Sequence, residues 1–172
     1  MRKLLRFGLL TLAGLTLACS ETIEMRIPVR PVNLELDLTY QDKALNTIQG
    51  WKIYRQNHVD QAGEYTGFGG VLVYHGLNAS GGDSFYAFDA ACPHEASSNV
   101  LIEVDESAIY GICPQCGSKY ELLNGIGNPV EGPAAQARLQ LQRYQTERVG
   151  HTLHVYNEKG SGRFIKKQEK IR

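Results

Sequence analysis

The sequence is dominated by short segments of strand length, separated by turns that contain glycine, proline or asparagine. In the first segment Val32, Leu34, Leu36, Leu38 and Tyr40 alternate with polar residues, which is the period of a half-buried strand. Eight further segments are predicted to be strands, and they cover residues 51–54, 70–75, 85–89, 100–104, 108–112, 119–122, 139–144 and 151–156. The segment at 70–75 (GVLVYH) is apolar enough to be buried on both faces.

Helical periodicity is not sustained anywhere beyond a few residues, although 42–47 is expected to form one helical turn. The chain is therefore predicted to be all-β, folded as a small antiparallel barrel or sandwich. Its 172 residues fit one ordinary domain, and its hydrophobic fraction of 42% is typical of globular proteins. Lysine plus arginine equals aspartate plus glutamate at 18 each, so the chain has no basic excess to hold a phosphate backbone. Nucleic-acid binding is not expected.

The N-terminus is predicted to be an export signal. Arg2, Lys3 and Arg6 give it a positive start, and residues 8–18 form an uncharged, mostly apolar run. Such a run reaches roughly 16 Å as a helix, against about 30 Å for the hydrocarbon core of a bilayer. It is too short to span a membrane, and the polar residues from Ser20 onward favour a signal peptide at 1–18 over a buried helix.

The end of this signal, Thr16-Leu17-Ala18-Cys19, resembles the box of bacterial lipoproteins, in which the cysteine is acylated and becomes the first mature residue. Thr16 departs from the box, where leucine is commoner, and a free Cys19 in an ordinary signal peptide is the alternative. The resemblance implies an exported lipoprotein, anchored in a membrane through Cys19 and facing the periplasm or the cell exterior.

The predicted divisions are a signal peptide at 1–18, a tether at 19–30, the β domain at 31–157 and a basic tail at 158–172. Removing the signal removes three positive charges and no negative ones, which leaves 15 against 18 and a net charge of −3. The tail is interpreted as a solvated terminus.

Two loops of the domain carry donors for a metal. The first holds Cys92 and His94 in the spacing C-x-H, and the second holds Cys113 and Cys116 in the spacing C-x-x-C. Three thiolates and one imidazole suit zinc or iron–sulfur, and they do not suit calcium or magnesium. Three small buried residues beside a structural histidine are the alternative interpretation.

The residues around these loops resemble the Rieske iron–sulfur family. The stretch 85–95 (FYAFDAACPHE) resembles the strand and first cluster loop of that family, and 113–122 (CPQCGSKYEL) resembles the second loop. With the glycines and prolines that follow, the resemblance covers roughly residues 70–145. It implies an antiparallel barrel-like sandwich with a 2Fe–2S cluster held by two loops at one tip.

One position departs from the family, because Cys116 stands where the second ligand histidine belongs. Carried over by position, Cys92 and Cys113 would hold an inner iron, while His94 and Cys116 would hold an outer one. The additional thiolate favours the oxidised cluster, so the potential should lie below that of a comparable two-histidine centre. His94 would be the single proton site coupled to the cluster.

The resemblance also implies roles around the ligands. Ser118 and Tyr120 match a serine and a tyrosine whose hydroxyls donate to cluster or cysteine sulfur, although a turn serine and a core tyrosine are the ordinary alternatives. Pro133 would lie on a loop that covers the cluster. The cysteine pair that ties the two loops in respiratory members is missing, with Gln115 and Ala96 at or near its positions.

The sequence thus predicts a membrane-anchored electron-transfer protein with a redox partner protein, and not an enzyme by itself. An exported structural Zn²⁺ module with Cys₃His ligation is one alternative. A metal-free protein with a disulfide between Cys113 and Cys116 is another, because export leads to an oxidising compartment. The signal lacks two consecutive arginines, so a cluster would have to be acquired after secretion of an unfolded chain.

Overall fold

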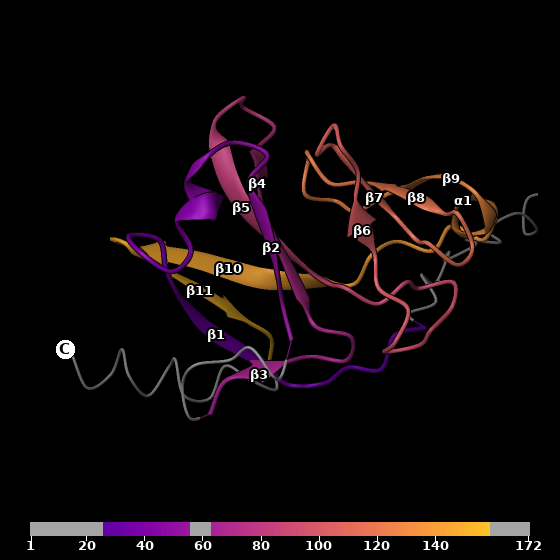
Figure 1. Cartoon of the computed structure of the whole chain (residues 1–172), viewed down its shortest axis with the longest axis horizontal. Coiled ribbons are helices and arrows are strands. Elements are labelled where there is room, and N and C mark those ends of the chain that lie inside the picture. The colour runs from indigo at the N-terminus through magenta and orange to yellow at the C-terminus, as the bar shows by residue number, and fades with distance from the viewer. Residues whose placement is uncertain (1–25, 56–62, 159–172) are drawn as a thin grey trace, which may run out of the picture.

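The computed structural model describes residues 26–55 and 63–158. The predicted signal peptide, Cys19 and nearly all of the predicted basic tail lie outside these residues. Within them the chain forms strands and two short helical segments, so the prediction of an all-β chain is confirmed. The strands make one antiparallel, nearly closed, barrel-like sheet and a second small sheet (Figure 1).

The large sheet contains seven strands in the order β2-β4-β5-β10-β11-β1-β3. Its strands are β1 (Val32–Asp37), β2 (Trp51–Tyr54), β3 (Tyr65–Thr66), β4 (Val71–Leu77), β5 (Asp83–Asp89), β10 (Arg143–Val149) and β11 (Thr152–Tyr156). The 3₁₀ helix η1 (Lys43–Asn46) precedes β2, where the sequence predicted a helical turn. The longest pairing joins β4 to β5 from Val71↔Asp89 to Leu77↔Asp83.

The small sheet contains four antiparallel strands in the order β6-β7-β8-β9. They are β6 (Glu103–Val104), β7 (Tyr110–Ile112), β8 (Lys119–Glu121) and β9 (Pro129–Glu131), and the short helix α1 (Pro133–Gln136) follows. This sheet and α1 lie at the right of Figure 1, and the turn between β10 and β11 lies at the left end of the long axis.

The burial of two strands follows the patterns predicted from the sequence. In β1, Val32, Leu34 and Leu36 are buried, and the residues between them are half-buried. In β4, six consecutive residues are buried, as expected for the run at 70–75. Both faces of β4 are therefore covered, and this gives the molecule two cores.

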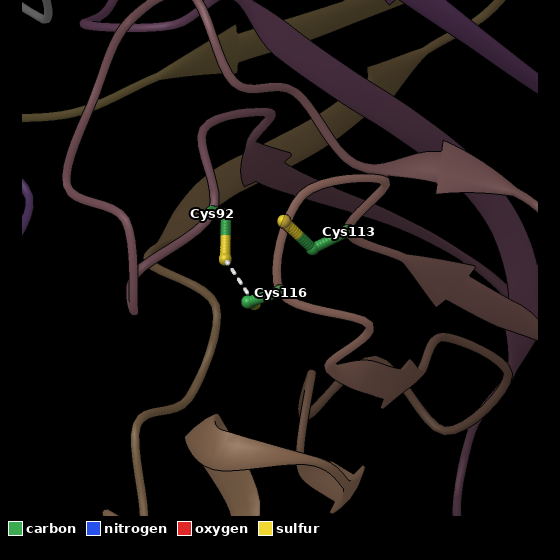
Figure 2. Close-up of side chains that lie close together, drawn as sticks. All are labelled: Cys92, Cys113 and Cys116. Atoms are coloured by element: carbon green, nitrogen blue, oxygen red, sulfur yellow. Dashed lines mark hydrogen bonds between the residues drawn. The ribbon is translucent and has the colours of Figure 1, made fainter.

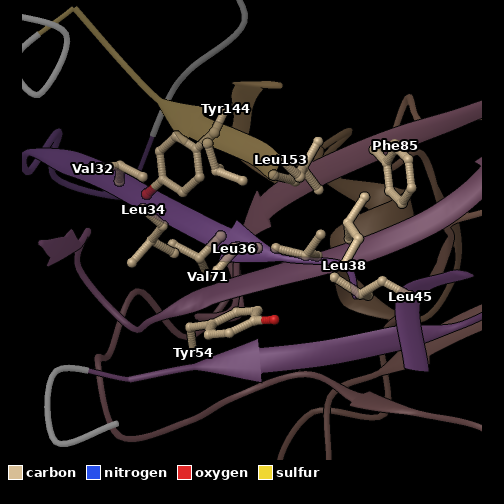
Figure 3. Close-up of a cluster of buried hydrophobic side chains, with 13 residues drawn as sticks. Val32, Leu34, Leu36, Leu38, Leu45, Tyr54, Val71, Phe85, Tyr144 and Leu153 are labelled. Carbon is tan, nitrogen blue, oxygen red and sulfur yellow. The ribbon is translucent and has the colours of Figure 1, made fainter. Parts of the chain in front are cut away.

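The barrel core fills the inside of the large sheet. Its members are buried aliphatic and aromatic side chains: Val32, Leu34, Leu36, Leu38, Leu45, Tyr54, Val71, Val73, Phe85, Ala87, Tyr144, Leu153 and Val155 (Figure 3). Because β1, β2, β4, β5, β10 and β11 all contribute, this core holds the barrel together.

The site core lies on the opposite faces of β4 and β5, between them and the small sheet. Its buried members are Leu72, Tyr74, Tyr86, Phe88, Ala90, Cys92, Ile102, Cys113, Tyr120, Leu122, Ala134, Leu139 and Leu141. Alternation along β4 and β5 assigns neighbouring residues to different cores, since side chains of a strand point to opposite faces in turn. Two of the three described cysteines belong to this second core.

The structure differs from the predicted elements in several places. The strand expected at 139–144 is displaced, because Leu139 and Leu141 pack into the site core outside any ladder and β10 begins at Arg143. The strands β3 and β9 were not predicted, since two or three residues are too short to show a period. The helix α1 was also missed, and it occupies a single turn after Gly132.

Candidate metal centre

The first loop of the candidate centre begins three residues after β5. The Cys92 N–H donates to the Val100 carbonyl at 3.0 Å, and the Ala96 N–H donates to the Cys92 carbonyl at 2.9 Å. Cys92 and Pro93 are buried, whereas His94 is half-buried. The Arg26 guanidinium donates to the His94 carbonyl at 2.9 Å, so the start of the described chain is bound to this loop.

The second loop connects β7 to β8 in a tight turn. The Cys113 N–H donates to the Ser118 carbonyl, and the Gly117 N–H donates to the Cys113 carbonyl, both at 2.9 Å. Gly117 has a φ of +69°, a left-handed conformation that favours glycine. Cys113 is fully buried, and Cys116 is half-buried on the outer side of the turn.

The three cysteines are brought together by these loops (Figure 2). Their Sγ atoms lie within 4.8 Å of one another, and the Cys92 and Cys116 Sγ atoms are 3.7 Å apart. All three are free cysteines, so the disulfide considered between Cys113 and Cys116 is not formed in this structure. Cys92, Cys113 and Cys116 could hold a metal ion.

The spacing of the sulfurs fits thiolate ligation. Two thiolates bound at about 2.3 Å to one tetrahedral Zn²⁺ lie roughly 3.8 Å apart, close to the 3.7 Å between Cys92 and Cys116. The ligand types also fit, because soft thiolates select zinc and iron–sulfur centres. The ligand types therefore fit zinc or iron–sulfur, while the 3.7 Å spacing is that of two ligands on one ion.

His94 lies on the outer side of the centre. An imidazole nitrogen of His94, the Cys116 Sγ and a carboxylate oxygen of Glu95 form a second group of possible ligands within 4.8 Å of one another. Among the described residues, His94 shares a group with Cys116, and it shares none with Cys92 or Cys113. By burial, the four predicted ligands fall into a buried pair, Cys92 and Cys113, and a half-buried outer pair, His94 and Cys116. Cys116 belongs to both groups of possible ligands.

The hydroxyl of Ser118 lies against the outer pair. Its Oγ accepts the Ala134 N–H at 3.0 Å and lies 3.1 Å from the Cys116 Sγ. The neutral Cys116 thiol donates to this oxygen. A Cys116 thiolate has no hydrogen to give, so the Ser118 hydroxyl would donate to it instead. Pro133, predicted to cover the centre, is the first residue of α1 and immediately precedes Ala134.

The hydroxyl of Tyr120 lies against the buried pair, 3.4 Å from the Cys92 Sγ. Burial raises the pKa of Tyr120, and so does its hydrogen bond with Cys92. The phenol therefore keeps its proton near neutral pH and can donate it to sulfur. Both residues predicted to contact sulfur, Ser118 and Tyr120, lie where such contacts form.

Two of the thiols have shifted pKa values in opposite directions. Burial raises the pKa of Cys113 to about 12, although amide N–H groups of Cys116 and Gln115 oppose the rise. Burial also disfavours the thiolate of Cys116, but hydrogen bonds from the Ser118 side chain and backbone outweigh it and lower the pKa. Without a cation, the buried thiol therefore stays protonated while the outer one ionises more readily. A metal would displace the proton of Cys113.

Asp89, which the sequence did not single out, holds the base of the first loop. Its buried carboxylate accepts N–H groups from Phe68, Gly69 and Ala91 at 2.9–3.0 Å and the Tyr144 hydroxyl at 2.6 Å. A side chain at Gly69 would meet the Cβ of Ala91 at 2.6 Å, so glycine allows this close approach. Asp89 thereby fixes the backbone directly before Cys92.

Glu95 and Gln115 were also missed as site residues. The Gln115 amide donates to Glu95 Oε2 at 2.6 Å, which ties the second loop to the first. The sequence placed Gln115 and Ala96 at or near the positions of the missing cysteine pair, and the contact joins Gln115 to Glu95, the residue before Ala96. Each residue stands next to a predicted ligand, and the sequence holds no further indication of their contact.

Comparisons with models of protein families and with curated proteins find no match to the chain. None of the described helices has the length and apolar character needed to cross a bilayer.

Proposed function

We propose that the protein is an electron-transfer protein whose loaded form holds a 2Fe–2S cluster. Cys92 and Cys113 would bind the inner iron, and His94 and Cys116 would bind the outer iron. The observation that carries this proposal is the division of the donors, since each loop contributes one buried and one half-buried donor. A cluster with one enclosed iron and one iron near the surface requires two buried and two half-buried donors.

The cluster would supply one electron at a time. The protein would determine what can reach the cluster and how stable its reduced state is. Burial of Cys92 and Cys113 keeps solvent from the inner side. Partial exposure of His94 and Cys116 leaves the outer side open to a redox partner protein. Hydroxyl donors at Ser118 and Tyr120 favour the more negative, reduced state.

A structural zinc module is a second candidate, favoured by the 3.7 Å between the Cys92 and Cys116 sulfurs. This distance is that of two ligands on one ion, and ligands of two different irons would have to separate further. In this case the three thiolates would occupy one tetrahedron and His94 would turn inward to complete it.

Metal and sulfide analysis of the full-length chain, expressed and purified without oxygen, separates these candidates. We expect two irons and two acid-labile sulfides per chain, with a rhombic EPR signal after reduction. One zinc in a colourless protein would overturn the cluster and support the second candidate. A protein that binds neither metal would overturn both.

The substitution Cys116→His tests the ligand assignment. Replacing the outer thiolate by a neutral imidazole should raise the midpoint potential, because two-histidine centres lie above all-cysteine ones. The opposite substitution, His94→Cys, should lower it. An unchanged potential in both variants would contradict the assignment of these two residues to the outer iron.

We further propose that Cys19 is acylated and anchors the exported protein in a bacterial membrane. Mass spectrometry of the mature N-terminus should find a lipid-modified cysteine as the first residue. An unmodified Cys19, or cleavage elsewhere, would contradict the anchor and would leave the metal centre unaffected.

A further inference from the structure

The three free thiols of the candidate centre differ in their exposure and in their contacts. Cys116 is half-buried, whereas Cys92 and Cys113 are fully buried. The Sγ atoms of Cys92 and Cys116 are 3.7 Å apart, and this is the contact drawn in Figure 2. A reagent in solution therefore reaches the sulfur of Cys116 first, and that sulfur is already in contact with a thiol of the other loop.

The sulfur of Cys113 is engaged within its own turn. Amide N–H groups of Gln115 and Cys116 donate to it, and backbone hydrogen bonds of 2.9 Å close the turn on both sides of Cys113. The sulfur of Cys92 has no such backbone donor among its printed contacts, which are the Tyr120 hydroxyl at 3.4 Å and the Cys116 thiol. Of the two buried thiols, Cys92 is therefore the one that is free to react with Cys116.

A polar contact aligns the two loops in the absence of a metal. The Gln115 amide donates to Glu95 Oε2 at 2.6 Å, and these residues are one position from Cys116 and three positions from Cys92. A disulfide requires about 2.05 Å between its sulfurs, so from 3.7 Å the two atoms would have to move about 1.7 Å closer. The loops are thus held in the arrangement that a bond between them needs.

We propose that Cys92 and Cys116 are a redox modification site, joined by a disulfide oxidant in the metal-free chain while Cys113 remains a free thiol. The Cys116 sulfur, after losing its proton, attacks one sulfur of the oxidant RSSR, which gives a mixed disulfide and RS⁻. The deprotonated Cys92 sulfur then attacks the Cys116 sulfur and releases the second RS⁻. The two cysteines lose two electrons and two protons, and the oxidant is reduced to two RSH.

This modification would control whether the centre can be filled. The bond consumes one donor from each loop, so Cys113 would be the last thiol able to bind a metal. The oxidised chain would exclude zinc and iron–sulfur alike, and reduction would open the site again. The inference therefore does not depend on which metal the reduced centre holds.

Disulfide mapping of the full-length chain tests the pairing, with oxidised glutathione as the oxidant. The chain carries Cys19→Ser, which removes the one cysteine outside the described residues, and is reduced and freed of metal beforehand. Remaining thiols are alkylated, and fragment ions formed between Cys113 and Cys116 show which of the two is alkylated. We expect the cross-link between Cys92 and Cys116 and the alkyl group on Cys113.

The same chain unfolded in urea is the matched control. There the shorter loop favours a bond between Cys113 and Cys116, so the pairing should change on unfolding. Among folded variants, Cys113→Ser should still form the cross-link. Cys116→Ser should lose the reaction with glutathione, because both of its remaining thiols are buried. With Co²⁺ as the metal probe, the oxidised chain should lose binding and dithiothreitol should restore it.

A cross-link that includes Cys113 in the folded chain, or a folded chain that forms none, would overturn the proposal. So would a Cys116→Ser variant that reacts as fast as its parent. These results concern the oxidised chain, so the proposed function would stand. A reduced chain that binds no metal would instead overturn the metal centre, and the mapped disulfide would remain.

Discussion

The two cores of the molecule are built on the same pair of strands and differ in what they enclose. On one face of β4 and β5, the barrel core contains aliphatic and aromatic side chains. On the other face, the site core contains the two buried cysteines and Tyr120, whose hydroxyl reaches the Cys92 sulfur. One residue step along a strand therefore separates a position that stabilises the fold from one that supports the candidate centre.

The two cores also differ in the partners of the polar side chains at their margins. Beside the barrel core, the Asp42 carboxylate accepts the Tyr54 hydroxyl at 2.5 Å and the Lys52 ammonium at 2.7 Å, so side chains of the protein supply its hydrogen bonds. At the margin of the site core, the Ser118 Oγ accepts the Ala134 N–H and the Cys116 thiol, which lies 3.1 Å away. The barrel core therefore contains no group of possible metal ligands among the described residues, whereas the site core borders three cysteines that could hold a metal ion.

The largest difference between the cores is expected when one buried residue of each is replaced by a polar residue of similar volume. Cys92→Ser should abolish metal binding, since a serine hydroxyl is a poor ligand for a thiolate-preferring metal. Val73→Thr, at a fully buried position of the barrel core, should keep the metal and lose about 1–3 kcal/mol of unfolding free energy. Metal content and urea unfolding measure the two quantities. Metal loss in both variants would contradict the separation.

A matched pair of leucines should have the next largest effect. Leu34 lies in the barrel core and Leu122 in the site core, and their exposed fractions are 1% and 0%. Replacement of either by alanine should cost about 2–5 kcal/mol of unfolding free energy, because each leaves a cavity. Leu122→Ala should also weaken Co²⁺ binding, whereas Leu34→Ala should not. Equal affinities in both folded variants would show that the site core does not support the loops.

A smaller effect is expected for Ser118→Ala, which removes the acceptor of the Ala134 N–H and the partner of Cys116. It should cost about 1–2 kcal/mol of stability. Because hydrogen bonds from Ser118 lower the pKa of Cys116, the variant should raise that pKa, and alkylation of metal-free Cys116 should move to higher pH. Alkylation rates against pH test this, with the exposed Ser80→Ala as the control. An unshifted profile would contradict the role of the hydroxyl.

The smallest effect is expected for Tyr120→Phe. The hydroxyl makes one 3.4 Å contact with sulfur, so its removal should change the unfolding free energy by less than about 1 kcal/mol. Tyr144→Phe, which removes a 2.6 Å hydrogen bond to buried Asp89, should cost about 1.5–3 kcal/mol. In the loaded protein Tyr120→Phe should also lower the midpoint potential. A larger stability loss for Tyr120→Phe than for Tyr144→Phe would reverse this order.

Most of the fold could be predicted from the sequence, because alternation and turn residues are local signals. The alternation from Val32 to Leu38 placed β1 and its buried face, and the run at 70–75 predicted a strand covered on both sides. Segments whose conformation depends on distant partners could not be predicted in this way. Leu139 and Leu141 have the spacing of a strand, yet they lie outside the ladder because the site core takes their side chains.

The residues of the candidate site also divide into those that the sequence predicted and those that it did not. Ligand spacing within each loop predicted that Cys92, Cys113 and Cys116 would meet, and the structure brings them together. The carboxylates of Asp89 and Glu95 gave no comparable signal. Their roles depend on which N–H groups the folded backbone presents to them and, for Glu95, on the alignment of two loops that lie twenty residues apart.

The most direct test of the proposed centre is a Mössbauer spectrum of ⁵⁷Fe-labelled, reduced full-length protein. The division into a buried pair and an outer pair predicts two inequivalent irons, with the ferrous iron at the site that His94 and Cys116 share. A single tetrahedral iron, two equivalent irons, or a protein that takes up no iron would contradict it.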